Sequence, residues 1–328
     1  MMKKIMNTKT MAGYSSLSTL NWLNVLFLVL VAAVASGCGG GGNSSLASSP
    51  VVGVSTAGIL CNYSSNVFNN SPSVNATAQA VWGCSPSQRI LNSNGLPDHP
   101  VGIFPNPGNP NAISVQAVSF SAQLSPTLSG ATLFLNGPRG TGYALNGIKM
   151  EAGTGGLATC DNTGTTCSLS ANVGPWLIEA LGQTAFNFGV DENYGHVQPD
   201  GAYHYHGVPK GFIDRLGKGV SMTLIGWAAD GFPVYARYGY TSAGDAASPL
   251  KIIQSSYRIK AMPDANRPST SLFAMGTFLQ DYEYVAGLGD LDECNGRTGV
   301  TPEFPNGIYH YYATDSYPYL QRCVKGRL

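Results

Sequence analysis

The feature that most constrains the fold of this chain is an internal duplication, because two motifs occur twice and in the same order. The first reads Gly-aromatic-Ala-x-Asn/Asp-Gly-apolar-x-apolar and occupies residues 142–150 and 226–234. The second places an Asp-Glu step before a tyrosine–histidine string, at residues 191–206 and 292–312. A glycine-rich chain can produce one such likeness by chance, but two in matching order favour a true duplication.

The duplication predicts two β-rich halves, at about 112–215 and 216–328, packed about a pseudo-twofold axis. Each copy of the first motif contains a step that is typical of hairpin turns, Asn146-Gly147 and Asp230-Gly231, because these residue types tolerate positive φ. We therefore expect a tight turn at the same place in both halves.

Local patterns along the chain indicate mostly short strands. Residues 117–124 and 222–227 alternate apolar and polar side chains, the period of a half-buried strand. Helical signals are few: residues 175–181 lie between a proline and a glycine, and 211–216 have room for a turn or two. The expected fold class is therefore α+β, dominated by β-structure, after a loop-rich N-terminal segment at 51–111.

The N-terminus has the layout of an export signal. Three lysines within the first nine residues precede an apolar run at 25–35, which is short for a membrane span. The run ends in Ala35-Ser36-Gly37-Cys38, which resembles the lipobox of bacterial lipoproteins, although leucine is commoner at the position of Ala35. We expect 1–37 to be a lipoprotein signal peptide and Cys38 to be lipidated. The alternative is an uncleaved anchor helix, and both place the rest of the chain outside.

Residues 38–50 are predicted to be a flexible tether. They are rich in glycine and serine and cannot bury enough apolar surface to fold. Such a chain has a root-mean-square reach on the order of 20 Å. We therefore expect a cell-envelope, lipid-anchored, extracytoplasmic protein whose membrane contact is the anchor at Cys38.

The charge balance excludes one class of partner. Only 11% of the 328 residues are charged, and Lys+Arg equal Asp+Glu at 18 each. A basic face for nucleic acid is therefore not expected. A small molecule, a glycan or a protein stays open as the partner.

The cysteine count agrees with an oxidising compartment. Without Cys38, an even number remains, which indicates three disulfides. Short separations favour the pairs Cys61–Cys84, Cys160–Cys167 and Cys294–Cys323. A thiolate metal site is the alternative, but it lacks the CxxC spacing that such sites use.

The histidines are the candidate ligands for a metal. On a strand, His204 and His206 would point to one side and the neighbouring tyrosines to the other. The duplication makes His310 the counterpart of His204, which predicts three imidazoles near one another. His196, Asp191 and Asp200 are candidates for further ligands.

Imidazole and carboxylate without free thiol suit Zn, Cu(II), Mn or Fe, and the spacing alone does not choose among them. Two alternatives stay open. The strings could form a polar or catalytic site without metal, or an amphipathic strand whose polar atoms are bonded internally.

The tyrosine–histidine string also carries a family resemblance. Residues 200–209 contain Asp-Gly, then Tyr-His-Tyr-His, then Gly-x-Pro, and this is similar to YHYH-domain proteins. The segments 230–235, 281–282 and 291–297 strengthen the likeness, which extends over about 186–323. The resemblance implies no catalytic residue, so the metal hypothesis depends on spacing and duplication.

Motifs of other common functional sites are absent from the sequence or incomplete. The chain has no Gly-x-Ser-x-Gly elbow, P-loop or complete dinucleotide fingerprint. Asp290-Leu291-Asp292 begins like a calcium loop, but Cys294 and Gly296 break the EF-hand pattern, which leaves only an irregular calcium site open. The tyrosines near the C-terminus would stack on sugars or, more commonly, pack in a core: Tyr309, Tyr311, Tyr312, Tyr317 and Tyr319.

Three functions remain as hypotheses. The first is an envelope protein that binds Zn, Cu or another transition metal through clustered histidines. The second is a metal- or His/Asp-dependent hydrolase, with Asp200 or Asp230 beside the histidines. The third is a non-catalytic module for glycans or proteins, which predicts an exposed aromatic patch.

Overall fold

The computed structural model describes residues 53–135 and 140–328. The predicted signal peptide, the lipidated Cys38 and the tether therefore lie outside the described residues. Within the described part of the chain, no helix has the length and apolar character needed to span a bilayer.

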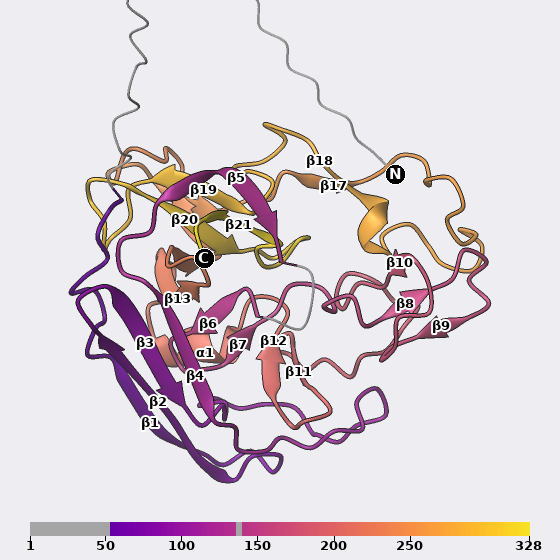
Figure 1. Cartoon of the computed structure of the whole chain (residues 1–328), viewed down its shortest axis with the longest axis horizontal. Helices are drawn as coiled ribbons and strands as arrows, with labels where there is room; N and C mark the ends of the chain where they lie inside the picture. Colours follow the sequence, from indigo (N-terminus) through magenta and orange to yellow (C-terminus); the bar gives the residue numbers. More distant parts are fainter. Residues whose placement is uncertain (1–52, 136–139) are drawn as a thin grey trace, which may run out of the picture. The chain divides into compact units, whose positions relative to one another are not determined.

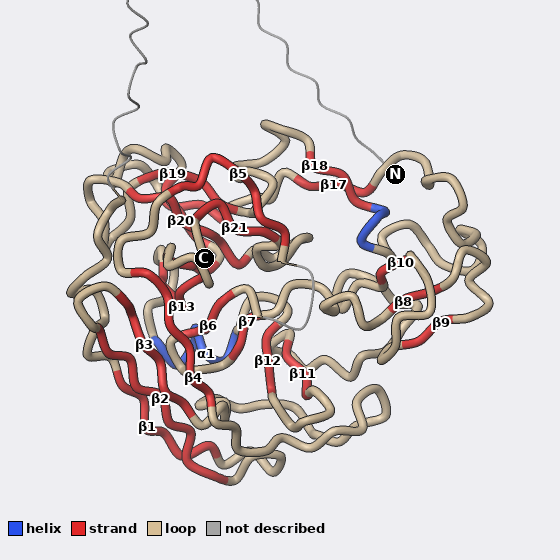
Figure 2. The backbone as a smooth tube through the Cα atoms, viewed as in Figure 1, coloured by secondary structure: helices blue, strands red, loops and turns tan. Residues whose placement is uncertain are grey.

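Strands dominate the structure, and Figure 2 shows that long loops connect them. The α-helix found in the described ranges is α1 (Lys210–Leu216), which confirms the helical turns predicted at 211–216. A 3-10 turn, η1, covers Leu279–Asp281. The β-dominated α+β prediction is therefore confirmed.

The helix predicted at 175–181 is wrong. Trp176–Leu177 form β10 instead, and the next two amides donate to carbonyls outside the segment. Ile178 N–H donates to Ala158 O at 2.9 Å, and Glu179 N–H donates to Thr277 O at 3.0 Å. A helix of seven residues would form too few hydrogen bonds to offset the free-energy cost of its nucleation. The hydrogen bonds to distant parts of the chain therefore favour the extended conformation.

The central element is an eight-stranded sheet with the order β11-β12-β7-β6-β13-β14-β20-β19. One half of the sheet comes from the first copy of the duplication and the other half from the second. The strands of the first copy are β6 (Gly142–Ala144), β7 (Lys149–Met150), β11 (Gly195–Val197) and β12 (Tyr203–Tyr205). The strands of the second copy are β13 (Thr223–Ala228), β14 (Pro233–Ala236), β19 (Gly296–Gly299) and β20 (Ile308–Ala313).

The sheet order confirms the predicted pseudo-twofold. The two halves meet at the antiparallel pair β6–β13, and each half has the same strand pairings outward from there. The first pairing is an antiparallel hairpin (β6–β7 and β13–β14), the second is parallel (β7–β12 and β14–β20), and the outer one is antiparallel (β12–β11 and β20–β19). The axis therefore passes between β6 and β13. Equivalent side-chain contacts agree, since Tyr203 OH donates to Asp191 at 2.8 Å and Tyr309 OH donates to Asp292 at 2.9 Å.

The two hairpin glycines hold the predicted conformation. Gly147 has φ +82° and Gly231 has φ +89°. Each turn also lies so close to a neighbouring strand that a Cβ atom would clash with it. A Cβ added to Gly147 would be 2.1 Å from Ser93 Oγ, and one added to Gly231 would be 2.3 Å from Gln123 O. Both conformation and space therefore require glycine at these turns.

The segment predicted to be loop-rich, 51–111, contains three of the four strands of an antiparallel sheet (Figure 1, indigo). Its members are β1 (Ser64–Asn69), β2 (Ala76–Cys84), β3 (Gln88–Ser93) and β4 (Val118–Gln123). The strand predicted at 117–124 is thereby confirmed. Trp82 of β2 is buried and donates its indole N–H to Leu145 O at 2.8 Å, which joins this sheet to the first hairpin turn of the central sheet.

Four smaller sheets complete the described elements. They are β8 (Thr159–Cys160) with β9 (Cys167–Ser168) and β10, β15 (Tyr238–Tyr240) with β16 (Leu250–Ile252), β17 (Tyr257–Ile259) with β18 (Tyr282–Tyr284), and β5 (Leu128–Phe134) with β21 (Cys323–Gly326).

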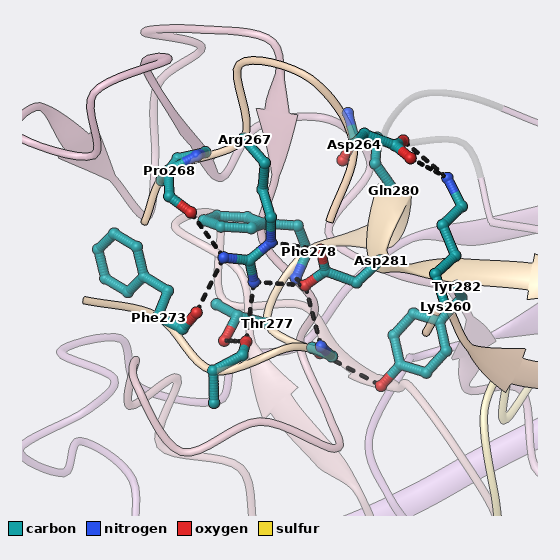
Figure 3. A network of polar contacts seen from close by, with 12 residues as sticks. Lys260, Asp264, Arg267, Pro268, Phe273, Thr277, Phe278, Gln280, Asp281 and Tyr282 are labelled. Carbon is teal, nitrogen blue, oxygen red and sulfur yellow. Dashed lines mark hydrogen bonds and ion pairs between the residues drawn. The ribbon is translucent and has the colours of Figure 1, made fainter. Parts of the chain in front are cut away.

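Two hydrophobic clusters form the core. The larger one surrounds the central sheet and contains the buried tyrosines of both strings. The smaller one includes Trp176 and Phe278. Figure 3 shows the ion pair beside it, in which the Arg267 guanidinium binds both carboxylate oxygens of Asp281 at 2.6 and 2.8 Å. Arg267 also lies over the Phe278 ring, so a fully bonded charge pair supports this cluster.

The three disulfides pair as predicted: Cys61–Cys84, Cys160–Cys167 and Cys294–Cys323. Disulfides form and persist in oxidising compartments. They indicate an extracytoplasmic protein.

Candidate metal centre

Three histidines from the first half of the sheet form one cluster. His196 on β11 and His204 on β12 are direct register partners across an antiparallel pair. His206 follows two residues later, so its side chain lies on the same face as that of His204. The ring centroids are 4.6–4.7 Å apart for all three pairs. His204 and His206 are buried, whereas His196 is partly exposed.

The tyrosines of the string lie on the opposite face, as the period-two pattern predicts. Tyr205 OH donates to His99 Nε2 at 2.6 Å and accepts from Asn146 at 2.9 Å. Tyr203 OH bonds to Asp191. These contacts hold the strand on one side, which leaves the histidines on the other side free to face one another.

Main-chain carbonyls fix the tautomer of each histidine. A carbonyl oxygen can only accept, so a ring nitrogen bonded to it carries the hydrogen. The Nδ1 atoms of His196, His204 and His206 donate to Phe188 O at 2.9 Å, Ala202 O at 3.2 Å and Glu151 O at 2.9 Å, respectively. All three neutral rings therefore present a bare Nε2 lone pair.

Two of these lone pairs face each other. Nε2 of His196 and Nε2 of His206 are 2.9 Å apart. Burial, reinforced by the neighbouring His196 imidazole, holds the pKa of His206 well below its usual value, and burial also lowers the pKa of His196. A shared proton is therefore unfavourable at neutral pH. A cation between these two acceptors would make their close approach attractive.

The third ring completes the donor set. His204 and His196 offer ligand atoms in the same group as His206, all within 4.8 Å of one another. Burial is the main cause that holds the pKa of His204 well below its usual value, followed by the charges of the other two imidazoles. Metal-binding histidines commonly donate their second N–H to a carbonyl or carboxylate, which orients the ring and fixes the tautomer. The cluster has this feature at all three positions.

A charged group lies beside the cluster on the same face of the sheet. Lys149 on β7 is the register partner of His204. Its ammonium lies 2.6 Å from the Glu151 carboxylate and donates to Gln198 Oε1 at 2.9 Å. Gln198 also donates to Glu151 at 3.1 Å, and burial raises the pKa of Glu151. Lys149 and Gln198 line a pocket of about 760 Å³.

His310 is not part of this cluster, which corrects the expectation that it joins His204 and His206. Five inter-strand steps separate β12 from β20, or about 24 Å along the sheet at about 4.8 Å per step. Figure 1 shows β11 and β12 at one end of the sheet and β19 and β20 at the other. A pseudo-twofold makes these histidines equivalent without bringing them together.

The two aspartates proposed as further ligands also lie elsewhere. Asp200 is exposed in the turn between β11 and β12, where its carboxylate accepts from Ala202 N–H at 3.1 Å. Asp191 lies on the tyrosine face and bonds to Tyr203 OH and to Gly102 N–H. Neither belongs to the group of converging ligand atoms.

The motifs did not predict Lys149 and Glu151 as neighbours of the histidines, but the sequence carries one signal for them. Lys149 and Glu151 flank the buried Met150 in the first copy, where the second copy has Pro233 and Tyr235 around Val234. Charged side chains in only one copy of a repeated buried strand indicate a local function for that copy.

The fold and the site together define a β-dominated, disulfide-containing domain that is duplicated and carries a three-histidine cluster in one half. Residues 119–326, more than half of the chain, match the family described as YHYH protein, and the chain belongs to this family. The string at 203–206 supplies two of the three clustered histidines. No curated protein matches the chain, and no solved structure matches it.

Proposed function

We propose that this protein binds one divalent transition metal ion through the Nε2 atoms of His196, His204 and His206. The observation that carries the proposal is the 2.9 Å approach of two Nε2 atoms whose rings already donate through Nδ1. Without a cation, two lone pairs would be forced together in a largely buried site. With an ion, the same geometry is attractive.

The distances agree with known coordination geometry. Zn–N bonds are about 2.0–2.1 Å, so two nitrogens on one ion lie about 2.9–3.4 Å apart for bond angles of about 90–109°. The His196–His206 separation falls at the short end of this range. Neutral imidazoles suit Zn, Cu, Fe and Ni, and three protein ligands leave a position for water or another ligand.

We place this metal centre in the cell envelope, attached to a membrane through lipidated Cys38. The lipobox-like sequence before Cys38 supports the anchor, and the three disulfides support export. Mass spectrometry of the membrane fraction should therefore detect a mature protein that carries diacylglycerol on Cys38. A soluble mature chain with an unmodified Cys38 would contradict the anchor.

Metal-dependent hydrolysis is a second candidate function, favoured by one observation. A metal-bound water can have a pKa near 7, and a neighbouring carboxylate can accept its proton. Glu151 supplies a carboxylate beside the cluster, and its partners Lys149 and Gln198 line the pocket. Of the two carboxylates first considered for this role, Asp200 is exposed in a turn, and Asp230 accepts from Tyr311 OH in the second half.

A glycan-binding module has less support. Four of the five tyrosines that would form its stacking face are buried in the core, namely Tyr309, Tyr311, Tyr312 and Tyr317, and Tyr319 is partly buried. Tyr309 packs edge-on against Tyr311, and Tyr317 stacks parallel to Tyr282, which is the arrangement of a core.

The test of metal binding is the metal content of protein purified without a histidine tag. Wild type loaded with zinc and passed over a desalting column should retain one ion per chain. His204→Ala/His206→Ala should retain none, whereas His310→Ala, which removes the pseudo-equivalent histidine, should retain one. Equal retention by wild type and the double variant would contradict the proposal.

A further inference from the structure

We infer that Arg297, His310 and Tyr312 are a former metal site in which a hydrogen-bonded chain from the arginine guanidinium through Tyr312 to His310 replaces the ion. This inference rests on the proposed function of the first half. It predicts that two substitutions, Arg297→His and Tyr312→His, restore a second metal site. The reason is the residue-by-residue correspondence between the two ends of the sheet.

The backbone frame is the same in both halves. Arg297 on β19 is the register partner of His310, as His196 is of His204. Tyr312 N–H donates to Asn295 O at 2.9 Å, and in the first half His206 N–H donates to Tyr194 O at 2.7 Å.

His310 also keeps the ring orientation of its counterpart. Its Nδ1 donates to Ile308 O at 2.9 Å, two residues earlier on the strand. His204 uses Ala202 O, also two residues earlier, in the same way. The Nε2 lone pair of His310 is therefore aimed as a metal ligand would be, although no second imidazole is present to share an ion.

In the second half, Tyr312 and the Arg297 guanidinium form hydrogen bonds where the first half has His206 and His196. Tyr312 OH donates to His310 Nε2 at 3.1 Å, and Arg297 donates to the Tyr312 oxygen at 3.3 Å. Arg297 also donates to Tyr240 O at 2.8 Å, much as His196 bonds to a carbonyl outside the central sheet. The three side chains thus form a hydrogen-bonded network without a shared ion, in which the buried Arg297 Nε has no partner among the described residues.

The surroundings of the second site have lost their charged partners. Lys149 and Glu151 correspond to Pro233 and Tyr235, and the Tyr235 ring packs edge-on against His310 at 5.4 Å. An aromatic and apolar neighbourhood suits a structural network.

The test is the zinc stoichiometry of Arg297→His/Tyr312→His, purified without a tag and checked for intact disulfides and cooperative unfolding. We expect two ions per chain, against one for wild type. Adding His310→Ala to the double variant should return the value to one. A folded double variant that still binds one ion would overturn the inference and leave the proposed function intact.

The reciprocal exchange keeps the inference testable if that variant fails to fold. His196→Arg/His206→Tyr places the network of the second half at the first site. It should bind no zinc and should melt at a higher temperature than metal-free His196→Ala/His206→Ala. A melting temperature at or below that of the alanine variant would overturn the inference. Absence of zinc from wild type would instead count against the proposed function.

Discussion

His196 and His206 face each other through their Nε2 atoms at 2.9 Å, while each ring donates its Nδ1 hydrogen to a main-chain carbonyl. The two hydrogen bonds fix the tautomers, and burial disfavours protonation of either ring. A cation other than a proton would therefore stabilise this arrangement, in agreement with the proposed metal site. A metal that binds only the folded state should stabilise the fold.

Zinc should raise the melting temperature of the wild-type protein by several degrees. Ligand at 100 times its Kd adds about 2.7 kcal/mol to the free energy of unfolding. His204→Ala/His206→Ala should show no such shift, and a chelator should reverse the shift in wild type. Differential scanning calorimetry with and without zinc gives both values; equal shifts in the two proteins would mean that zinc binds elsewhere.

Acid should destabilise the fold partly through His310. Burial lowers the pKa of His310 to about 4, against 6.5 for an exposed ring. Between these pH values the unfolded chain binds a proton that the folded state excludes, so this stability is present above pH 6.5 and is lost as the pH falls towards 4. The loss is about 3 kcal/mol.

The matched variant is His310→Gln, which keeps a polar side chain and does not titrate. Urea unfolding at pH 7 and pH 4.5 should show a smaller fall in the free energy of unfolding for this variant than for wild type. Carboxylates contribute equally to both proteins and cancel in the comparison. Identical pH slopes would show that His310 does not exclude protons in the folded state.

Breaking the buried ion pair of Figure 3 should destabilise the protein strongly. The side chains of Arg267 and Asp281 are each 1% exposed, so Arg267→Met leaves a buried carboxylate without its cation. The expected cost is about 3–5 kcal/mol. The exposed pair Arg258–Glu283 is the control, where Arg258→Met should cost no more than about 1 kcal/mol. Equal costs in urea unfolding would contradict this assignment.

Reducing agent should lower the melting temperature, and the three disulfides should contribute unequally. Cys160 and Cys167 are 7 residues apart, whereas Cys294 and Cys323 are 29 apart. Loop entropy makes the shorter bridge worth about 1 kcal/mol less. Cys160→Ser/Cys167→Ser should therefore melt above Cys294→Ser/Cys323→Ser. A melting temperature insensitive to reductant would argue against all three bridges.

Much of this architecture can be predicted from the sequence because its signals are local or repeated. The repeated motifs give the symmetric sheet, the alternation of Tyr203 and His204 gives the two faces of the strand, and short spacings give the cysteine pairs. Each of these depends on residues close in sequence or on a pattern that occurs twice.

The arrangement of the site depends on long-range packing, which the sequence pattern does not contain. Duplication predicts that His204 and His310 are equivalent, but their distance depends on which strands lie on the axis, and these are β6 and β13. His196 joins the cluster because β11 pairs with β12 in one particular register. In the segment 51–111, the alanines of β2 alternate with Thr77 and Gln79 and give only a weak apolar period, although Trp82 of the same strand is fully buried.

The most direct test of the metal centre is an anomalous difference map from crystals of the tag-free protein, measured at the zinc edge after zinc loading. We expect one strong peak per chain, about 2.0–2.1 Å from Nε2 of His196, His204 and His206. No such peak is expected beside Arg297 and His310. A map without a peak between the three imidazoles would contradict metal binding at this cluster.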